Sequence, residues 1–353
     1  MDISLCMIVK DEAEVLARCL ESARGADEMI VVDTGSTDDT LQIAERFGAK
    51  TYSFPWQDDF SAARNFAFSK ATGDYLLWLD ADDVLEGDLS LIRPLLEQEA
   101  PDMVMCPYDV SFDETGKPSY TFFRERFLRR EAGFRFAGRV HECIVPSGKI
   151  VRADFRVRHL SGKKNRSDRN LRIYERQISD GEPLSPRDLL YYGRELYYYA
   201  RYEDAAEKFC ELLRGDGWYV NKIEACKLLA ECRAVLGDQD GAREALLLSF
   251  RFGEPRGSVC YALGRAGRSV RESIFWHEAA LLCDDHSAEG DFEEPLCRGL
   301  YPLLELTRLY YTEEDVTKAV QRHLRAVALA PAHPSVVHNH AFFQSKGLIQ
   351  PDH

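Results

Sequence analysis

The sequence predicts an α/β domain built on a parallel sheet, followed by an all-helical domain. In the first half of the 353-residue chain, short apolar runs alternate with segments of helical periodicity, which is the pattern of βαβ units. After Gly181 the strand patterns stop, and helical pairs with small residues recur at a spacing in the mid-thirties. The length also exceeds what one hydrophobic core comfortably fills. We therefore expect one domain at residues 1–180 and a second at 181–353.

The elements of the first domain follow from the spacing of its apolar residues. The expected strands are residues 3–9, 29–32, 50–54 and 75–79, and the expected helices are residues 12–23, 39–47 and a segment around 62–67. The second strand runs into Asp33 and the fourth into Asp80. Because parallel strands end at the same edge of a sheet, both carboxylates are expected at the edge where open α/β sheets bind ligands.

Asp80, Asp82 and Asp83 form a tight carboxylate cluster directly after the apolar run at 75–79. Like charges this close repel one another unless a cation or a hydrogen-bond network neutralises them, and a hard divalent ion with oxygen ligands does so. A turn that caps a helix is the alternative interpretation, because Asp is a common turn residue. These residues alone leave both interpretations open.

Two other ligand motifs are tested by spacing. An EF-hand loop needs a glutamate at its twelfth position, but counting from Asp80 reaches Leu91 and counting from Asp33 reaches Ala44. The chain also contains no G-x-x-x-x-G-K-[ST] and no G-x-G-x-x-G sequence. A bound nucleotide would therefore be held by carboxylates and a metal.

Charge and composition exclude several classes of protein. The formal net charge of −14 argues against a nucleic-acid binder. Basic residues dominate between Arg124 and Arg176, where they either attract phosphates or form a solvated face. The 10 cysteines include no C-x-x-C pair, which indicates a reduced, cytoplasmic protein. Neither a membrane span nor the basic start of a secretory signal is present, so we expect no membrane anchor.

Four segments in order resemble the successive signatures of family 2 glycosyltransferases with the GT-A fold. They are Ser4–Glu12 (SLCMIVKDE), Val31–Asp38 (VVDTGSTD), Ala63–Asn65 (ARN) and Leu79–Asp83 (LDADD). The resemblance covers roughly residues 3–165 and implies a Rossmann-like mixed sheet. It also implies an inverting hexosyl transfer from a nucleotide-sugar donor with Mn²⁺ or Mg²⁺, and it favours the metal interpretation of the acidic cluster.

The resemblance assigns roles to particular residues. Asp33 would hydrogen-bond the nucleobase, typically uracil, and Asp82 would be the direct metal ligand, with Asp80 and His159 completing the metal site. The residues implied at the nucleotide sugar are Asp11, Glu12, Asp33, Arg64, Asn65, Asp80 and Ala81. Many members have Pro-x-Tyr-Asn after the first strand, whereas this chain has Ile8-Val9-Lys10-Asp11, so stacking of that tyrosine on the base is not implied. A turn-stabilising Asp33 and a surface ion pair at Arg64 are the alternatives.

The acceptor side is expected around Glu142 and His141. Inverting transfer needs a base that takes the proton of the attacking group, and we expect Glu142 to be that base. A structural pairing of Glu142 with Arg139, and a His159 that is only hydrogen-bonded, are the alternatives. Bacterial proteins that look like this modify peptides, including at cysteine sulfur, or saccharides and lipids. A thiolate acceptor would need little help from Glu142.

The second half matches the tetratricopeptide pattern. One unit begins near Leu189, a second near Leu229, a degenerate third lies at 263–280, and a last full unit begins near Leu303. Such a solenoid presents a surface to a peptide, a protein or glycan acceptor, or a second protomer, unless it only steadies the catalytic domain. The competing function is a non-catalytic scaffold with a relic nucleotide-sugar-binding domain. An undamaged set of Asp33, Arg64, Asp80 and Asp82 argues against that.

Overall fold

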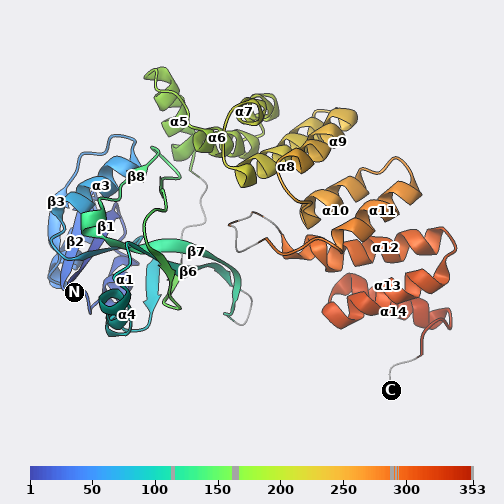
Figure 1. The fold of residues 1–353 in the computed structure, drawn as a ribbon, viewed down its shortest axis with the longest axis horizontal. Helices are drawn as coiled ribbons and strands as arrows, with labels where there is room; N and C mark the ends of the chain where they lie inside the picture. Colours follow the sequence, from blue (N-terminus) through green and yellow to red (C-terminus); the bar gives the residue numbers. More distant parts are fainter. Residues whose placement is uncertain (113–115, 161–166, 287–289, 291, 293, 351–353) are drawn as a thin grey trace. The chain divides into compact units, whose positions relative to one another are not determined.

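The structure, a computed structural model, describes residues 1–112, 116–160, 167–286, 290, 292 and 294–350 (Figure 1). The chain divides into two compact units, Met1–Asp188 and Leu189–His353. The first unit contains a mixed α/β sheet and the second is helical throughout its described residues. The predicted order of fold classes is therefore confirmed.

The first unit alternates strands and helices up to β4 and then becomes richer in strands. Its strands are β1 (Ile3–Val9), β2 (Glu28–Asp33), β3 (Lys50–Ser53), β4 (Tyr75–Trp78), β5 (Asp83–Glu86), β6 (Met103–Phe112), β7 (Pro118–Arg129), β8 (Phe136–Ala137), β9 (Cys143–Ile144), β10 (Ile150–Arg152) and β11 (Arg156–His159). Its helices are α1 (Leu16–Ser22), α2 (Thr40–Arg46), α3 (Phe60–Lys70), α4 (Arg93–Glu99) and α5 (Arg169–Ser179), with 3₁₀ turns at Leu89–Leu91 and Arg130–Ala132. The first strands are those expected from the apolar spacing.

The main sheet has the strand order β3-β2-β1-β4-β7-β6-β11-β5, and β10 pairs with β6. Strands β1 to β4 are mutually parallel, whereas β7 runs antiparallel to both β4 and β6. The last pair, β11 and β5, is also antiparallel. The sheet is therefore mixed, and the carboxyl ends of β1, β2 and β4 share one edge.

Both faces of this sheet are covered, which explains why β1 and β4 are almost continuously apolar. One face packs against α1 and α2, with Leu5, Leu20 and Leu77 in its core. The other face packs against α3 and the β8–β9 pair, with Trp78 and Phe136 in its core. Two-sided burial fixes the position of β4, which delivers the acidic cluster.

The second unit consists of consecutive helix pairs (Figure 1). The helices are α6 (Pro186–Tyr198, which begins in the first unit), α7 (Tyr202–Arg214), α8 (Tyr219–Val235), α9 (Gln239–Leu248), α10 (Gly257–Arg265), α11 (Val270–Ala280), α12 (Leu300–Thr312), α13 (Val316–Leu329) and α14 (Pro334–Ser345), with 3₁₀ turns at Ser249–Arg251 and Pro295–Arg298. Small residues allow close packing, because a Cβ on Gly193 would lie 2.5 Å from the ring of Phe209. The paired arrangement is tetratricopeptide-like, as the repeat spacing predicts.

We expect the second unit to lose stability in mild acid through His277 on α11. Its side chain is 1% exposed and its Nδ1 has no hydrogen-bond partner among the described residues. Burial, opposed by Glu305 and reinforced by Arg308 and Arg265, lowers the pKa of His277 to about 4. Between about pH 6.5, the ordinary pKa of histidine, and about pH 4, the His277 ring takes up a proton in the unfolded chain but not in the folded protein. The free energy of unfolding should therefore fall by up to about 3 kcal/mol over that range as the pH decreases.

The measurement is denaturant unfolding followed by helical circular dichroism between pH 7.5 and 4. The control is His277→Gln, which cannot titrate and should remove this part of the pH dependence while leaving the part that carboxylates contribute. An unchanged pH profile in His277→Gln would contradict the prediction.

Candidate active site

The acidic cluster lies at the carboxyl end of β4, the last strand of the parallel region, which lies between β1 and the antiparallel β7. Leu79 continues the buried run, and the chain then turns at Asp80. The Asp83 N–H donates to the Asp80 carbonyl at 3.0 Å, and the Asp80 N–H donates to Oδ2 of Asp83 at 3.1 Å. The turn therefore lets the Asp80 carboxylate reach Arg64, while the carboxylates of Asp82 and Asp83 lie near His159.

Arg64 on α3 joins Asp80 to Glu142. Its Nη2 donates to Oδ1 of Asp80 and its Nε donates to Oε1 of Glu142, each at 2.6 Å. The Arg64 side chain is 9% exposed and its guanidinium lies 5.0 Å from the Trp78 ring centroid. Burial would raise the pKa of Asp80, but the charge and hydrogen bond of Arg64 hold it at about 2. Asp80 is thus an anion whose charge Arg64 largely balances.

Asp82, Asp83 and His159 form a second group, whose three ligand atoms lie within 4.8 Å of one another. His159 reaches it because β11 pairs with β5 in a register that places His159 opposite Asp83. Its Nδ1 lies 3.2 Å from Oδ1 of Asp83 and 3.4 Å from Oδ1 of Asp82. The hydrogen bond to Asp83 and the nearby carboxylates raise the pKa of His159 against the effect of burial, while burial raises the pKa of Asp82.

This donor set fits a divalent cation, since carboxylate oxygens suit Mg²⁺ and Mn²⁺ and imidazole is accepted by first-row metals. Asp82 and His159 lie together as the sequence-based hypothesis expected. The third member is Asp83, however, whereas Asp80 is held by Arg64. Asp82 is 24% exposed, which leaves it accessible to an ion.

Two residues that contact this cluster were not predicted from the sequence as site residues. Arg126 on β7 had been grouped with residues that attract phosphates or are solvated, yet its side chain is 0% exposed and its Nη1 lies 3.2 Å from Oδ2 of Asp83. Tyr108 on β6 donates its hydroxyl to Oδ1 of Asp83 at 3.0 Å. The spacing carried no signal for these contacts, because β7 shifts register at Arg126, where Phe127 pairs with Val104 and Glu125 with Met105, so strand alternation does not predict the face of Arg126.

The residues expected at the nucleobase form a hydrogen-bonded loop at the same sheet edge. Asp33 accepts hydrogen bonds from the Gly35 N–H and the Ser36 N–H, each at 3.1 Å, and is 5% exposed. Asp11, with φ at 52°, accepts from the Thr37 N–H at 2.7 Å. Asp33 therefore makes the contacts of the turn-stabilising alternative, and its role at a base stays a prediction.

Glu12 and Ala81 are placed by the backbone around them. The Glu12 N–H donates to Oγ1 of Thr40 at 2.8 Å, at the start of α2. Ala81 is 6% exposed, between Asp80 and Asp82. Their assignment to the nucleotide sugar stays a prediction.

The acceptor-side residues lie near the short β8–β9 pair. Next to this pair lies Asn65, which the resemblance implies at the nucleotide sugar; both polar atoms of its amide bond the backbone of Phe136 at 2.9 Å, so Asn65 fastens β8 to α3, and its role at the donor stays a prediction. His141 has φ at 51°, and its carbonyl accepts from Nε of Arg187 at 3.0 Å. Arg139 bonds Asp180 and Glu182 instead of the Glu142 considered as its partner.

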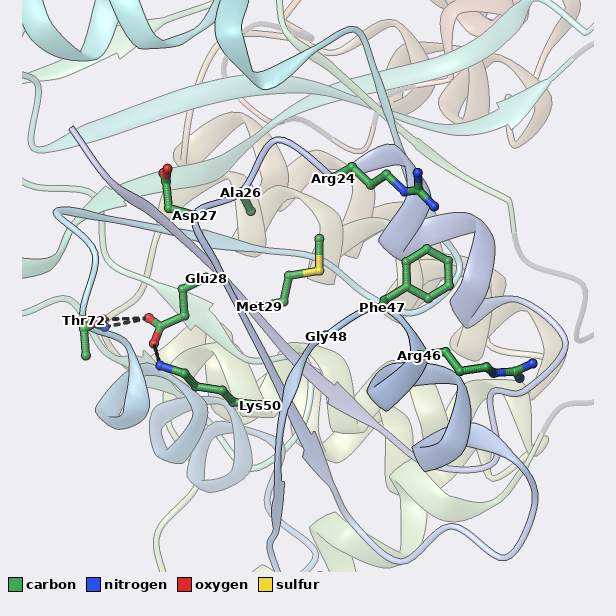
Figure 2. A pocket seen from close by; sticks show the side chains of 10 residues that line it. All are labelled: Arg24, Ala26, Asp27, Glu28, Met29, Arg46, Phe47, Gly48, Lys50 and Thr72. Atoms are coloured by element: carbon green, nitrogen blue, oxygen red, sulfur yellow. Dashed lines mark hydrogen bonds and ion pairs between the residues drawn. The ribbon is translucent and has the colours of Figure 1, made fainter.

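A cavity of about 600 Å³ lies elsewhere on the first unit (Figure 2). It is lined by Arg24, Ala26, Asp27, Glu28, Met29, Arg46, Phe47, Gly48, Lys50 and Thr72. Glu28 and Lys50 begin β2 and β3, so the cavity belongs to the sheet edge opposite Asp33. It contains none of the predicted site residues. Glu28 is already bonded there to Lys50 and Thr72, as Figure 2 shows.

Residues 4–156 match the family model described as Glycosyl transferase family 2. The first unit therefore contains a family 2 glycosyltransferase domain, as the four motifs indicated. A TPR repeat-containing protein of Synechococcus elongatus is 44% identical over 149 residues, which make up 41% of this chain and 36% of that protein. The SPbeta prophage-derived glycosyltransferase SunS of Bacillus subtilis is 29% identical over 230 residues, 58% of this chain and 51% of that protein.

The chain thus spans between about a third and about half of the length of these curated relatives. Among solved structures, it resembles glucosyl-3-phosphoglycerate synthase from Mycobacterium tuberculosis in complex with Mn²⁺, UDP-glucose and phosphoglyceric acid. The identity is 27% and the TM-score 0.26, over 30% of this chain and 44% of that chain. Within the described ranges, no helix has both the length and the apolar character that a bilayer crossing requires.

Proposed function

We propose that the protein is an inverting, metal-dependent glycosyltransferase that moves a sugar from a UDP-sugar to a peptide, protein or saccharide acceptor. The observation that carries the proposal is the acidic cluster at the carboxyl end of β4 within a family 2 glycosyltransferase domain. Asp82 is accessible there, next to His159 and close to the Arg64 pair. A carboxylate and imidazole site of this kind matches the needs of a diphosphate leaving group.

The donor would be held at the shared edge of β1, β2 and β4. Asp82 and His159 would hold a Mn²⁺ or Mg²⁺ ion, which when bound stabilises the negative charge that develops on the departing UDP. Asp80 keeps Arg64 in place, so a fixed guanidinium lies beside the same site. Asp33 and Asp11 would contact the nucleobase side from the loop that they already order.

The transfer step would be a single displacement at the anomeric carbon. The acceptor oxygen forms a bond to this carbon as the bond to the phosphate oxygen breaks, and UDP leaves with the electron pair. Glu142 takes the acceptor proton. Because Oε1 of Glu142 already accepts from Arg64, we assign the proton to Oε2. His141 is adjacent to this base, and its backbone is held by Arg187.

A screen of nucleotide sugars by thermal unfolding tests the donor class. A UDP-sugar with Mn²⁺ at about 100 times its Kd should stabilise the protein by roughly 2.7 kcal/mol, and other nucleotide sugars should stabilise it less. The rise in Tm with increasing ligand is the readout, and each sugar is repeated with EDTA as the control. A set of donors that leave Tm unchanged with and without Mn²⁺ would contradict the proposal.

The helical unit is proposed to recruit the acceptor or a second protomer. A chain ending at Ala200 should retain slow UDP release but lose transfer to the true acceptor. We choose Ala200 over the predicted boundary near Gly181 because it preserves the contact of Arg187 with the His141 carbonyl. Rates of UDP release and of acceptor labelling are compared with those of the full chain. Equal labelling by the shortened protein would exclude a recruiting role.

A further inference from the structure

The carboxylate of Asp83 is saturated by protein donors. Its Oδ1 accepts from the Tyr108 hydroxyl at 3.0 Å and lies 3.2 Å from Nδ1 of His159. Its Oδ2 accepts from the Asp80 N–H at 3.1 Å and lies 3.2 Å from Nη1 of Arg126. A carboxylate offers about four acceptor positions; three accept hydrogen bonds here, and the Arg126 guanidinium forms an ion pair at the remaining side. The side chain is also 0% exposed, so no position of Asp83 is open to an ion.

The same contact selects the tautomer of the neutral His159 ring. An ionised carboxylate only accepts hydrogen bonds, so in the neutral ring Nδ1 must carry the proton that bonds to Asp83. This leaves Nε2 as the nitrogen with a free lone pair. A metal-binding histidine in proteins usually donates its other N–H to a carboxylate or carbonyl in this way, which fixes both its tautomer and its orientation.

Arg126 is the counter-charge that makes this arrangement stable. Its guanidinium lies 4.0 Å from the centroid of Trp78 and 4.3 Å from that of Tyr108. Nη1 also donates to the Trp78 carbonyl at 3.1 Å, while Nε and Nη2 have no hydrogen-bond partner among the described residues. Arg126 is therefore fully buried with some of its N–H donors unpaired, which is unusual for a buried polar group. Its charge is balanced at this position by the ion pair with Asp83.

We propose that Asp83 and Arg126 are positioning residues, which hold His159 in its Nδ1–H tautomer so that Nε2 receives the cation. Oδ1 of Asp82 lies 3.4 Å from Nδ1 in the metal-free protein, so the Asp82 carboxylate would turn toward Nε2 to share the ion. This rests on the proposed function for the identity of the ligand, but the orientation of His159 is a property of the metal-free protein. Asp83 is then not a third metal ligand, although its oxygen lies close enough to be counted among the candidate ligand atoms.

Two readouts test the assignment in the full-length protein. Nitrogen-15 NMR of the metal-free protein, at a pH where the ring is neutral, should show His159 protonated at Nδ1, and Asp83→Ala should give a mixture of tautomers. Mn²⁺ titration by electron paramagnetic resonance should show a Kd raised about 10- to 100-fold in Asp83→Ala, the usual effect of losing such a partner. Arg126→Met should shift both readouts in the same direction, and Arg126→Lys should restore part of each.

Asp109→Ala is the matched control. Asp109 is also an aspartate with 0% exposure, on β6, but it bonds Thr121 and Arg156 instead of His159. Its loss should lower stability and leave both the His159 tautomer and the Mn²⁺ affinity unchanged. Equal shifts in Asp109→Ala and Asp83→Ala would overturn the proposal by showing a general effect on folding.

Tyr108→Phe separates positioning from direct ligation. Removing the hydroxyl frees one acceptor position on Asp83, so a direct ligand would bind Mn²⁺ more tightly, whereas a positioning residue would not. Tighter binding in Tyr108→Phe, or a wild-type His159 protonated at Nε2, would overturn the proposal even if other variants fail to fold. Wild-type protein that does not bind Mn²⁺ would refute the proposed function instead, and the tautomer would still decide the role of Asp83.

Discussion

Asp82→Ala should reduce metal-dependent release of UDP from a UDP-sugar by about 10³-fold, or roughly 4 kcal/mol of transition-state stabilisation. Asp82 is the carboxylate of the cluster that remains open to an ion, because Arg64 holds Asp80 and protein donors fill Asp83. His159 alone would bind a divalent ion weakly. The measurement is steady-state UDP release at increasing Mn²⁺ concentrations. The highest concentrations must saturate the variant, so that weaker metal binding can be told from a lower kcat.

Asp154→Ala is the control for this experiment. The Asp154 side chain is 93% exposed and lies just before β11. The substitution therefore removes one negative charge from the same unit without changing a contact of the acidic cluster. UDP release should stay within about twofold of the wild type. An Asp82→Ala enzyme that retains the wild-type rate at every Mn²⁺ concentration would show that the cluster does not support the reaction.

Arg64→Met should destabilise the first unit by about 3–5 kcal/mol and abolish activity with it. Arg64 is the buried cation between Asp80 and Glu142, and its removal leaves two carboxylates close together without their main partner. Removing one member of a buried ion pair typically has this effect, because the remaining charge stays desolvated. Here that charge is chiefly Glu142, which is 11% exposed, whereas Asp80 is 34% exposed. Denaturant unfolding of the full chain, followed by Trp fluorescence, measures the loss.

Three further variants test whether the loss of stability comes from the unpaired carboxylates. Arg64→Lys keeps the charge but can no longer bond two carboxylates with a planar fork, so it should recover part of the stability. Asp80→Asn combined with Arg64→Met removes one unpaired charge and should also recover part. Arg176→Met breaks an ion pair with Asp58 in which Arg176 is 57% exposed, and it should change stability by less than about 1 kcal/mol. A loss in Arg64→Met no larger than that in Arg176→Met would contradict the account.

Local patterns predicted the parallel part of the sheet well. Strand β1 has the expected bounds, and the run at 75–79 forms β4 with Leu79 still buried. The first helix is shorter than expected, beginning at Leu16 instead of residue 12. The reason is visible in the contacts, because Thr40 and Asp38 bond the N–H groups of Glu12 and Ala13 and draw the segment into the loop beside Asp33.

The surroundings of the acidic cluster were harder to predict. Tyr108 and Arg126 come from the antiparallel β6–β7 pair, whose register shifts between Val104 and Met105. Pairing between strands far apart in the sequence has no local signal, so the contact of either residue with Asp83 could not be read from spacing. The family resemblance implied that Asp82 and His159 share one site, and the structure places them together. The resemblance could not show that Asp80 is bonded to Arg64.

The most direct test of the central claim is a crystal structure of the protein with UDP and Mn²⁺. We predict an ion bound by Asp82 and His159 at the carboxyl end of β4, with the UDP diphosphate on the same ion and Asp83 still bonded to Arg126. A structure in which UDP and Mn²⁺ bind elsewhere, or in which the Asp82 carboxylate contacts only protein atoms at saturating Mn²⁺, would contradict it.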